Sequence, residues 1–219
     1  MKFYRKLNEE NRSIFRKRVG LFLDEIYIEG VETEVEELDK VLIVASAIIP
    51  VFGFDEWHYN VLTSVILYPK SFNEQLGYSN NENDKRISGM VGTGRFQKQM
   101  ILSKAALRKG FFNITDKRNT AIHEFVHLMD KMDGETDGIP EGLLEKQFII
   151  PWLKAMHDEM EDINNNKSDI RKYGGMKQTE FFAVASEYFF ERPILMKKKH
   201  PDLYEMLVKC FNQVPMQNN

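Results

Sequence analysis

Two histidines and a glutamate make up the part of this sequence that is best suited to chemistry. They lie in the stretch AIHEFVHLMD, residues 121–130, as His123, Glu124 and His127. On a helix, residues four apart are about 40° from eclipsed and about 6 Å apart along the axis, so both imidazoles can converge on one zinc ion. Glu124 lies about 100° round the helix from His123, where it can reach a water on that ion and act as a general base.

An amphipathic helix with two structural histidines is the alternative interpretation of this stretch. Chance produces roughly 0.01 His-Glu-x-x-His patterns in a chain of this composition, so the metal site is the favoured interpretation. The residues around the histidines are apolar and predict a helix that packs in the core: Ala121, Ile122, Phe125, Val126, Leu128 and Met129.

A catalytic zinc site has three protein ligands and an open position for water, so a third ligand is needed. Asp133 lies six residues after the second histidine, but the metzincin pattern has a turning glycine where this sequence has Asp130, so the helix should carry Asp133 away. Glu180, Glu187 and Glu191 lie on one stripe of a downstream helix. A buried carboxylate needs a metal or a cationic partner, so at least one of them should have one. A solvated edge is the alternative for this stripe, above all for Glu191.

Several stretches resemble one bacterial family. HEFVHLMDKMDGETDGIP and YGGMKQTEFFAVASEYFF are similar to the Mlc titration factor A family of zinc peptidases, and ASAIIPVFGF with YNVLTSVILYPKSF resembles the N-terminal half of that family. The resemblance runs from about Arg12 to Pro193. A tyrosine followed after six residues by Glu-Phe-Phe-Ala also resembles the catalytic domain of anthrax-toxin lethal factor.

The resemblance implies a role for five residues. It makes His123, His127 and Glu180 the ligands of a zinc cofactor, with Glu180 in place of Asp133, and Glu124 the catalytic base. It also places Tyr173 near the metal, where its phenol can donate to an oxyanion.

A ligating histidine usually donates its other ring N–H to a carboxylate or carbonyl. Asp130 or Glu187 could accept that hydrogen bond, and a structural role for either is equally open.

The function that this resemblance implies is hydrolysis of peptide bonds by a zinc-dependent metallopeptidase of the gluzincin type. The activity is expected to be aminopeptidase-like and linked to the regulation of sugar uptake. A peptide or protein substrate would lie along an exposed strand edge, with QKQMILSK, residues 97–104, as the candidate. The alternative is a protein-binding factor that sequesters a transcriptional repressor, with hydrolysis secondary or absent.

The elements that must position these residues follow from periodicity and punctuation. A helix is expected from Ser13 to a stop at Gly30, and a second one capped by Thr33. A third helix, capped by Thr115 or Asp116, should carry the histidines. Further helices are expected over 141–164, interrupted or kinked near Pro151, and over 179–192 and 201–211. Strands are expected over 60–69, 87–96 and 97–104, with a polar loop over 79–86.

Gly89, Gly92 and Gly94 could suggest a phosphate loop, but the sequence lacks the Gly-Lys-Ser/Thr ending of such a loop, so these glycines indicate bends or bulges between strands. Of the remaining histidines, His58 and His200 are expected at the surface, and His157 lies in a charged helical stretch.

These elements predict an α+β fold. We expect a mostly helical, zincin-like single domain over 1–219, with a small, mainly antiparallel sheet packed on the helix of the two histidines. Its helical and strand part would cover about 1–112, and its metal-binding helical part about 113–219.

Composition limits the partners and the location. With 30 basic and 33 acidic residues, the net charge of -3 gives no reason to expect direct binding of nucleic acid. The most apolar run, 41–54, contains Pro50 and is too short to cross a membrane. The N-terminus does not resemble a signal peptide. A single cysteine, Cys210, forms no internal disulfide and is expected half-buried, so a cytoplasmic location is predicted.

Overall fold

The computed structural model of the protein describes residues 1–78, 86–92, 96–113 and 115–215. The chain divides into two compact units. The first comprises Met1–Ile49, His58–Asn113 and Asn119–Glu124, and the second comprises Pro50–Trp57, Ile114–Arg118 and Phe125–Asn219. Helix α5 (Thr120–Asp130) continues through the boundary between them. The single domain expected from the sequence stays a prediction.

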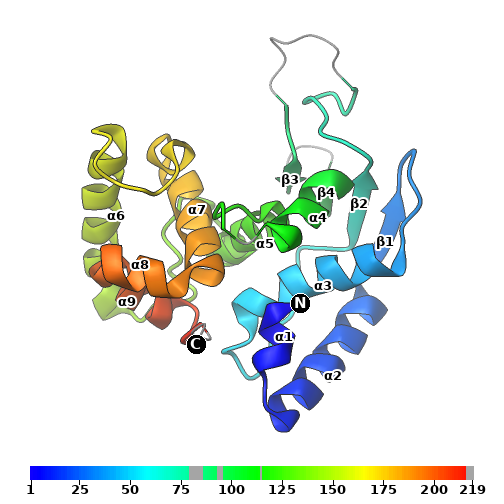
Figure 1. Ribbon diagram of the computed structural model, residues 1–219, viewed down its shortest axis with the longest axis horizontal. Coiled ribbons are helices and arrows are strands. Elements are labelled where there is room, and N and C mark those ends of the chain that lie inside the picture. The colour runs from blue at the N-terminus through cyan, green and yellow to red at the C-terminus, as the bar shows by residue number, and fades with distance from the viewer. Residues whose placement is uncertain (79–85, 93–95, 114, 216–219) are drawn as a thin grey trace. The chain divides into compact units, whose positions relative to one another are not determined.

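The first unit contains a mixed sheet of four strands (Figure 1). Its order is β1-β2-β4-β3, formed by β1 (Tyr27–Gly30), β2 (Ser64–Tyr68), β4 (Gln99–Ser103) and β3 (Gly89–Val91). The helix-rich α+β class is confirmed. The mainly antiparallel pairing is wrong, because β1–β2 and β2–β4 are parallel and only β3–β4 is antiparallel. Parallel strands need a long crossover, which helix α3 (Glu37–Val51) provides between β1 and β2.

The position of β4 in the sheet corrects one expectation about the substrate. β4 pairs with β2 on one side and with β3 on the other, so residues 97–104 do not offer the exposed edge that we expected. Met100, Ile101 and Leu102 are fully buried. The strand at this end of the sheet is β3.

The helices of the first unit begin and end at other residues than the sequence indicated. Helix α1 spans Lys2–Lys6, and α2 spans Glu9–Glu25 with Asn8 as its cap. Gly30 is not the end of α2 but the last residue of β1, a strand that periodicity did not reveal.

Thr33, the expected cap of the second helix, does not cap α3, which begins at Glu37. The first turn is held by Asp39, whose Oδ2 accepts from the backbone N–H of Glu36 (3.0 Å) and whose carboxylate is paired with Arg108. Arg108 belongs to α4 (Lys104–Phe112), which was not predicted and follows β4 directly, capped by Ser103.

The regular secondary structure described in the second unit is helical (Figure 1). Its elements after α5 are the 3-10 turns η2 (Lys131–Asp133), η3 (Lys146–Phe148) and η4 (Lys172–Gly175), and the helices α6 (Ile149–Asn164), α7 (Gln178–Glu191), α8 (Pro193–Lys199) and α9 (Pro201–Cys210). The helix expected over 141–164 begins at Ile149, eight residues after the expected start. Pro151 therefore lies in the first turn of α6, where its missing N–H leaves no hydrogen bond unmade, and causes no kink. α8 was not predicted.

Aromatic residues form the core of the second unit. Trp152 packs edge-on against Phe182 with ring centroids 5.5 Å apart, and Phe182 stacks on Phe211 at 5.9 Å. Cys210 lies fully inside this core and not half-buried as expected.

His200 is 8% exposed, so its expected surface position is wrong. Its ring bridges Glu159 and Asp169 with two contacts of 2.7 Å, and these ion pairs make its burial tolerable. His58 is exposed as expected, and His157 is exposed on α6.

Within the part of the chain that the structure describes, every helix is too short or too polar to cross a bilayer. The predicted location stays a prediction. The loop expected over 79–86, apart from Arg86, lies outside the described residues, as does Gly94.

Candidate metal centre

Helix α5 carries both histidines and begins at Thr120. Its first turn is held by Asn119, whose Oδ1 accepts from the backbone N–H of Ile122 (3.2 Å). The expected caps, Thr115 and Asp116, are wrong, because Lys117 has a positive φ of 58° that interrupts helical geometry after them. The apolar neighbours of the histidines are buried as predicted, so the helix is anchored in the core along its length.

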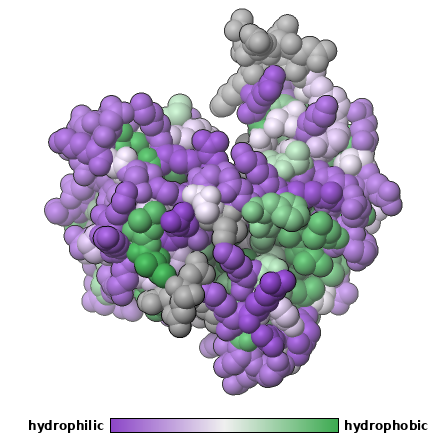
Figure 2. Space-filling model, viewed as in Figure 1, coloured by the Kyte–Doolittle hydropathy of each residue, from purple (hydrophilic) through white to green (hydrophobic). Residues whose placement is uncertain are grey.

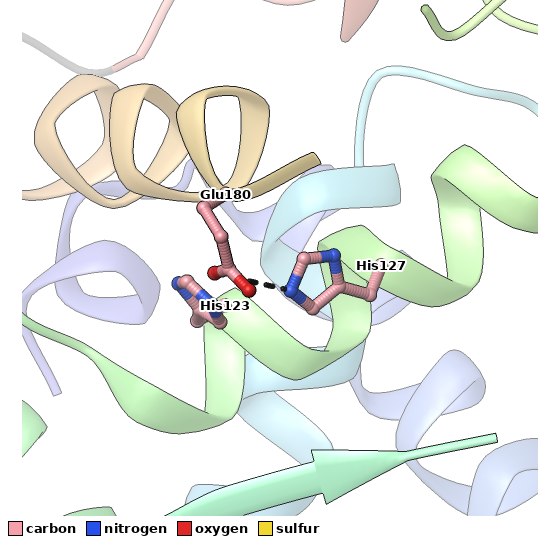
Figure 3. Close-up of side chains that lie close together, drawn as sticks. All are labelled: His123, His127 and Glu180. Atoms are coloured by element: carbon pink, nitrogen blue, oxygen red, sulfur yellow. Dashed lines mark ion pairs between the residues drawn. The ribbon is translucent and has the colours of Figure 1, made fainter. Parts of the chain in front are cut away.

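The structure brings His123, His127 and Glu180 together (Figure 3). One ligand atom from each residue lies within 4.8 Å of those from the other two. The two histidines are one turn apart on α5, and Glu180 points toward them from the first turn of α7. Nε2 of His127 lies 3.8 Å from Oε2 of Glu180. His123 is buried, whereas the other two side chains are partly exposed.

The chemistry and spacing of these three side chains fit a zinc ion. Two imidazoles and one carboxylate are a common ligand set of catalytic zinc, which takes three protein ligands. Ligand atoms on one tetrahedral zinc lie about 3.3 Å apart, so the separation of His127 from Glu180 needs little adjustment.

Glu124 is buried beside β3, within the first unit. A Cβ atom added at Gly89 would lie 2.5 Å from Oε1 of Glu124 and 2.7 Å from Cγ2 of Thr120. Only glycine therefore allows β3 to approach α5 this closely. Gly89 lies within β3 and not in a bend or bulge between strands, which corrects our expectation, whereas Gly92 follows β3 and turns the chain with a φ of 66°. An isolated glycine in a strand pattern was the available signal for this close approach.

Tyr173 lies on η4 and is 39% exposed. The two glycines after it allow η4 to pack tightly: a Cβ at Gly174 would lie 3.3 Å from Val184 on α7, and one at Gly175 would lie 2.5 Å from Oδ1 of Asn164 on α6. The backbone next to Tyr173 is thus held against α7, the helix that carries Glu180.

One glutamate of the stripe on α7 has the expected cationic partner. Glu187 is buried and forms an ion pair with Arg171, which confirms that expectation. Glu191 is not the solvated edge considered for it: its Oε2 accepts from the backbone N–H of Arg118 (3.0 Å), and burial raises the pKa of its carboxyl to about 8.

The two aspartates after the histidines take different positions. Asp133 is exposed at the end of η2, where its Oδ1 accepts from the backbone N–H of Glu135, and it does not join the ligand cluster. Asp130 is fully buried and accepts from the backbone N–H of Gly138 (2.9 Å). Burial raises the pKa of the Asp130 carboxyl to about 7.

Sequence comparisons relate the chain to known proteins. An uncharacterized protein of Synechocystis, slr2042, is 27% identical over 228 residues, covering 99% of this chain and 82% of that protein. Mlc titration factor A of Pectobacterium atrosepticum is 32% identical over 106 residues, and that of Escherichia coli is 30% identical over 107. Both alignments cover 45% of this chain, and 39% and 40% of those relatives. The chain thus matches less than half the length of either titration factor.

A solved structure from Bacteroides caccae, described as a candidate zinc-binding metallo-peptidase, aligns over 95% of both chains. Its TM-score of 0.36 and sequence identity of 13% are too low to bear on the site.

The family profile of the glucose-regulated metallo-peptidases M90 matches residues 1–212. This range includes both histidines and the distant glutamate of the cluster. The expected relationship to Mlc titration factor A is confirmed, and the resemblance to lethal factor stays a prediction. The chain belongs to the glucose-regulated metallo-peptidase M90 family.

Proposed function

We propose that the protein is a zinc-dependent metallopeptidase that hydrolyses peptide bonds. The observation that carries this proposal is the convergence of His123, His127 and Glu180, whose ligand atoms lie within 4.8 Å of one another. Membership of a metallo-peptidase family supports it. These three residues would hold the zinc ion, with two imidazole nitrogens and one carboxylate oxygen as ligands.

Glu124 would act as the general base of this site. A zinc ion, when bound, supplies a Lewis acid and lowers the pKa of a water that it holds toward ~7. Glu124 is buried directly after His123 on α5. In this role its carboxylate would take a proton from the attacking water and give it to the leaving amine. The contact with Gly89 limits where that carboxylate can move.

Tyr173 would donate its phenolic hydrogen to the oxyanion that forms during hydrolysis. Tyr173 is 39% exposed, and the packing of η4 on α7 restrains its backbone. A donor fixed in advance stabilises developing charge without reorganisation.

The substrate would pair with β3 as an extended peptide. β3 is the strand at one end of the sheet order, and it approaches α5 beside Glu124. Main-chain pairing with such an edge places a peptide bond without demanding a particular side chain. We propose aminopeptidase-like cleavage, which peptides with free and acetylated N-termini would distinguish from internal cleavage.

Metal analysis combined with a fluorogenic peptide panel tests the proposal. We expect one zinc per chain and hydrolysis that is lost on chelation and restored by zinc. A protein that binds no zinc, or one whose hydrolysis survives complete removal of the metal, would contradict it.

A second candidate function is sequestration of a transcriptional repressor, linked to sugar uptake. Figure 2 shows hydrophobic residues gathered at the surface over α3, where Leu38 and Val41 are 43% and 51% exposed. Exposed apolar patches often mark protein-binding surfaces. The relatives named Mlc titration factor A add support.

Titration calorimetry with a purified sugar-responsive repressor tests this second candidate. Val41→Glu should weaken binding, whereas Glu124→Gln should leave it unchanged. Absence of binding by the wild-type protein would reject it.

A further inference from the structure

Gly138 lies against the start of α7, the helix that carries Glu180. A Cβ atom added at Gly138 would lie 2.3 Å from the carbonyl oxygen of Gln178 and 3.0 Å from the backbone nitrogen of Thr179. No side chain fits into that space without moving one of the two backbones. Glu180 follows Thr179 directly, so a displacement of the backbone at Thr179 would also move the carboxylate of Glu180.

Gly138 is itself held from two sides by buried side chains. Its N–H donates to Oδ2 of Asp130 (2.9 Å), and its carbonyl accepts from Nε1 of Trp152 (2.8 Å). Both side chains are fully buried. Asp130 is the last residue of α5, three positions after His127. A continuous set of contacts thus runs from the helix of the histidines through Gly138 to the helix of the glutamate.

We propose that Asp130, Gly138 and Trp152 form a brace that positions Glu180 relative to His127. The inference rests on the metal centre proposed above and adds positioning residues to it. Metal–ligand distances are fixed to within about 0.2 Å, so a ligand from a separate helix needs support that sets its position before the metal arrives. The brace provides this support from the same unit of the chain that contains His127 and Glu180.

Two glycines of one loop provide a matched test. Gly138 and Gly134 both have a positive φ, 82° and 108°, so alanine strains the backbone at either position. The space around them differs, because a Cβ at Gly134 meets nothing within 4 Å. Gly138→Ala should therefore move the start of α7, and Gly134→Ala should not.

Zinc affinity is the quantity to measure, by competition with a chromophoric chelator. We expect Gly138→Ala to lower the affinity by about 10-fold or more, the range typical of residues that support metal ligands. Gly134→Ala should keep the wild-type affinity. The visible spectrum of the cobalt-loaded protein should change for Gly138→Ala alone, because it reports the ligand geometry. The melting temperature of each metal-free variant records any general loss of stability.

Asp130 offers an independent comparison if Gly138→Ala fails to fold. Asp130→Asn retains an oxygen that can accept from the N–H of Gly138, whereas Asp130→Ala does not. We expect the asparagine variant to bind zinc much more tightly than the alanine variant. Trp152→Phe keeps an aromatic ring of smaller size and loses the Nε1–H, so it should lower zinc affinity as well.

The possible failures are distinguishable. Wild-type protein that binds no zinc overturns both the metal centre and the brace. If the wild type binds zinc and Gly138→Ala binds it as tightly as Gly134→Ala, the brace is overturned and the metal centre stands. If Asp130→Ala and Asp130→Asn bind zinc with equal affinity, the brace is likewise overturned and the metal centre stands.

Discussion

Oε2 of Glu180 lies 3.8 Å from Nε2 of His127, although the two residues are 53 positions apart in the sequence. The contact joins α5 to the first turn of α7 within the second unit. Together with His123 they form a set of two imidazoles and one carboxylate that fits a single zinc ion. Removing Glu180 should therefore affect the metal before it affects the fold.

Glu180→Ala should lose zinc. The substitution removes one of three proposed ligands, so affinity should fall by more than about 100-fold, beyond the loss typical of supporting residues. Zinc per chain after gel filtration measures this. Glu161→Ala, an exposed change on α6, serves as the control. A Glu180→Ala protein that keeps one zinc would remove this residue from the ligand set.

Glu124→Gln should retain zinc and lose hydrolysis. Glutamine has nearly the same shape but takes up no proton, so kcat should fall by about 10²–10⁴-fold, the range of general-base catalysis. Peptide turnover and zinc content are measured on the same sample. The exposed Glu135→Gln should show wild-type turnover. Wild-type kcat in Glu124→Gln would reject the role of this base.

Gly89→Ala should lower turnover while leaving zinc bound. The new Cβ would lie 2.5 Å from Oε1 of Glu124, so the carboxylate must move or β3 must retreat. Gly20→Ala is the control, because a Cβ there meets nothing within 4 Å and alanine favours a helix by about 1 kcal/mol. Equal turnover of both variants would show that Glu124 tolerates the shift.

Tyr173→Phe should lower kcat with little change in KM. The substitution removes only the phenolic hydroxyl, and the loss of one oxyanion donor typically costs about 10²–10³-fold in rate. Steady-state kinetics separate the two constants. A change confined to KM would instead assign Tyr173 to substrate binding.

Stability should fall at alkaline pH because of His200. Burial alone lowers the pKa of His200, but its hydrogen bonds with Glu159 and Asp169 outweigh burial and raise the pKa above its ordinary 6.5. Other charges at this site are Lys117 and Lys199, both paired with Asp169. A raised pKa means that the contribution is complete below about pH 6.5 and is lost as the pH rises through the folded-state pKa.

Urea unfolding from pH 6 to 9 with chelator present measures this loss, worth about 1.4 kcal/mol per unit of pKa difference. His200→Asn should flatten the dependence, and the exposed His58→Asn should leave it in place. Identical slopes for wild type and His200→Asn would contradict the assignment to His200.

Local patterns predicted the parts of this protein that depend on neighbours in the sequence. Periodicity and punctuation predicted α7 and α9, a run of β-branched residues predicted β2, and the spacing of His123 and His127 indicated a shared ligand face. Each of these depends on residues a few positions apart, whose geometry the backbone sets by itself. Capping was less predictable, because Asn119 competes with several nearby polar residues and the backbone conformation of Lys117 decides between them.

Tertiary structure alone decided the remaining features. Residues far apart in the chain determine the parallel pairing of β1 with β2, the burial of His200 between two carboxylates, and the close approaches of Gly89 and Gly138. Nothing within a short window distinguishes a glycine in a turn from one pressed against another backbone. The sequence by itself determined which side chains could bind a metal. The packing of α7 decided which glutamate faces the histidines, because that choice depends on contacts made across the folded core.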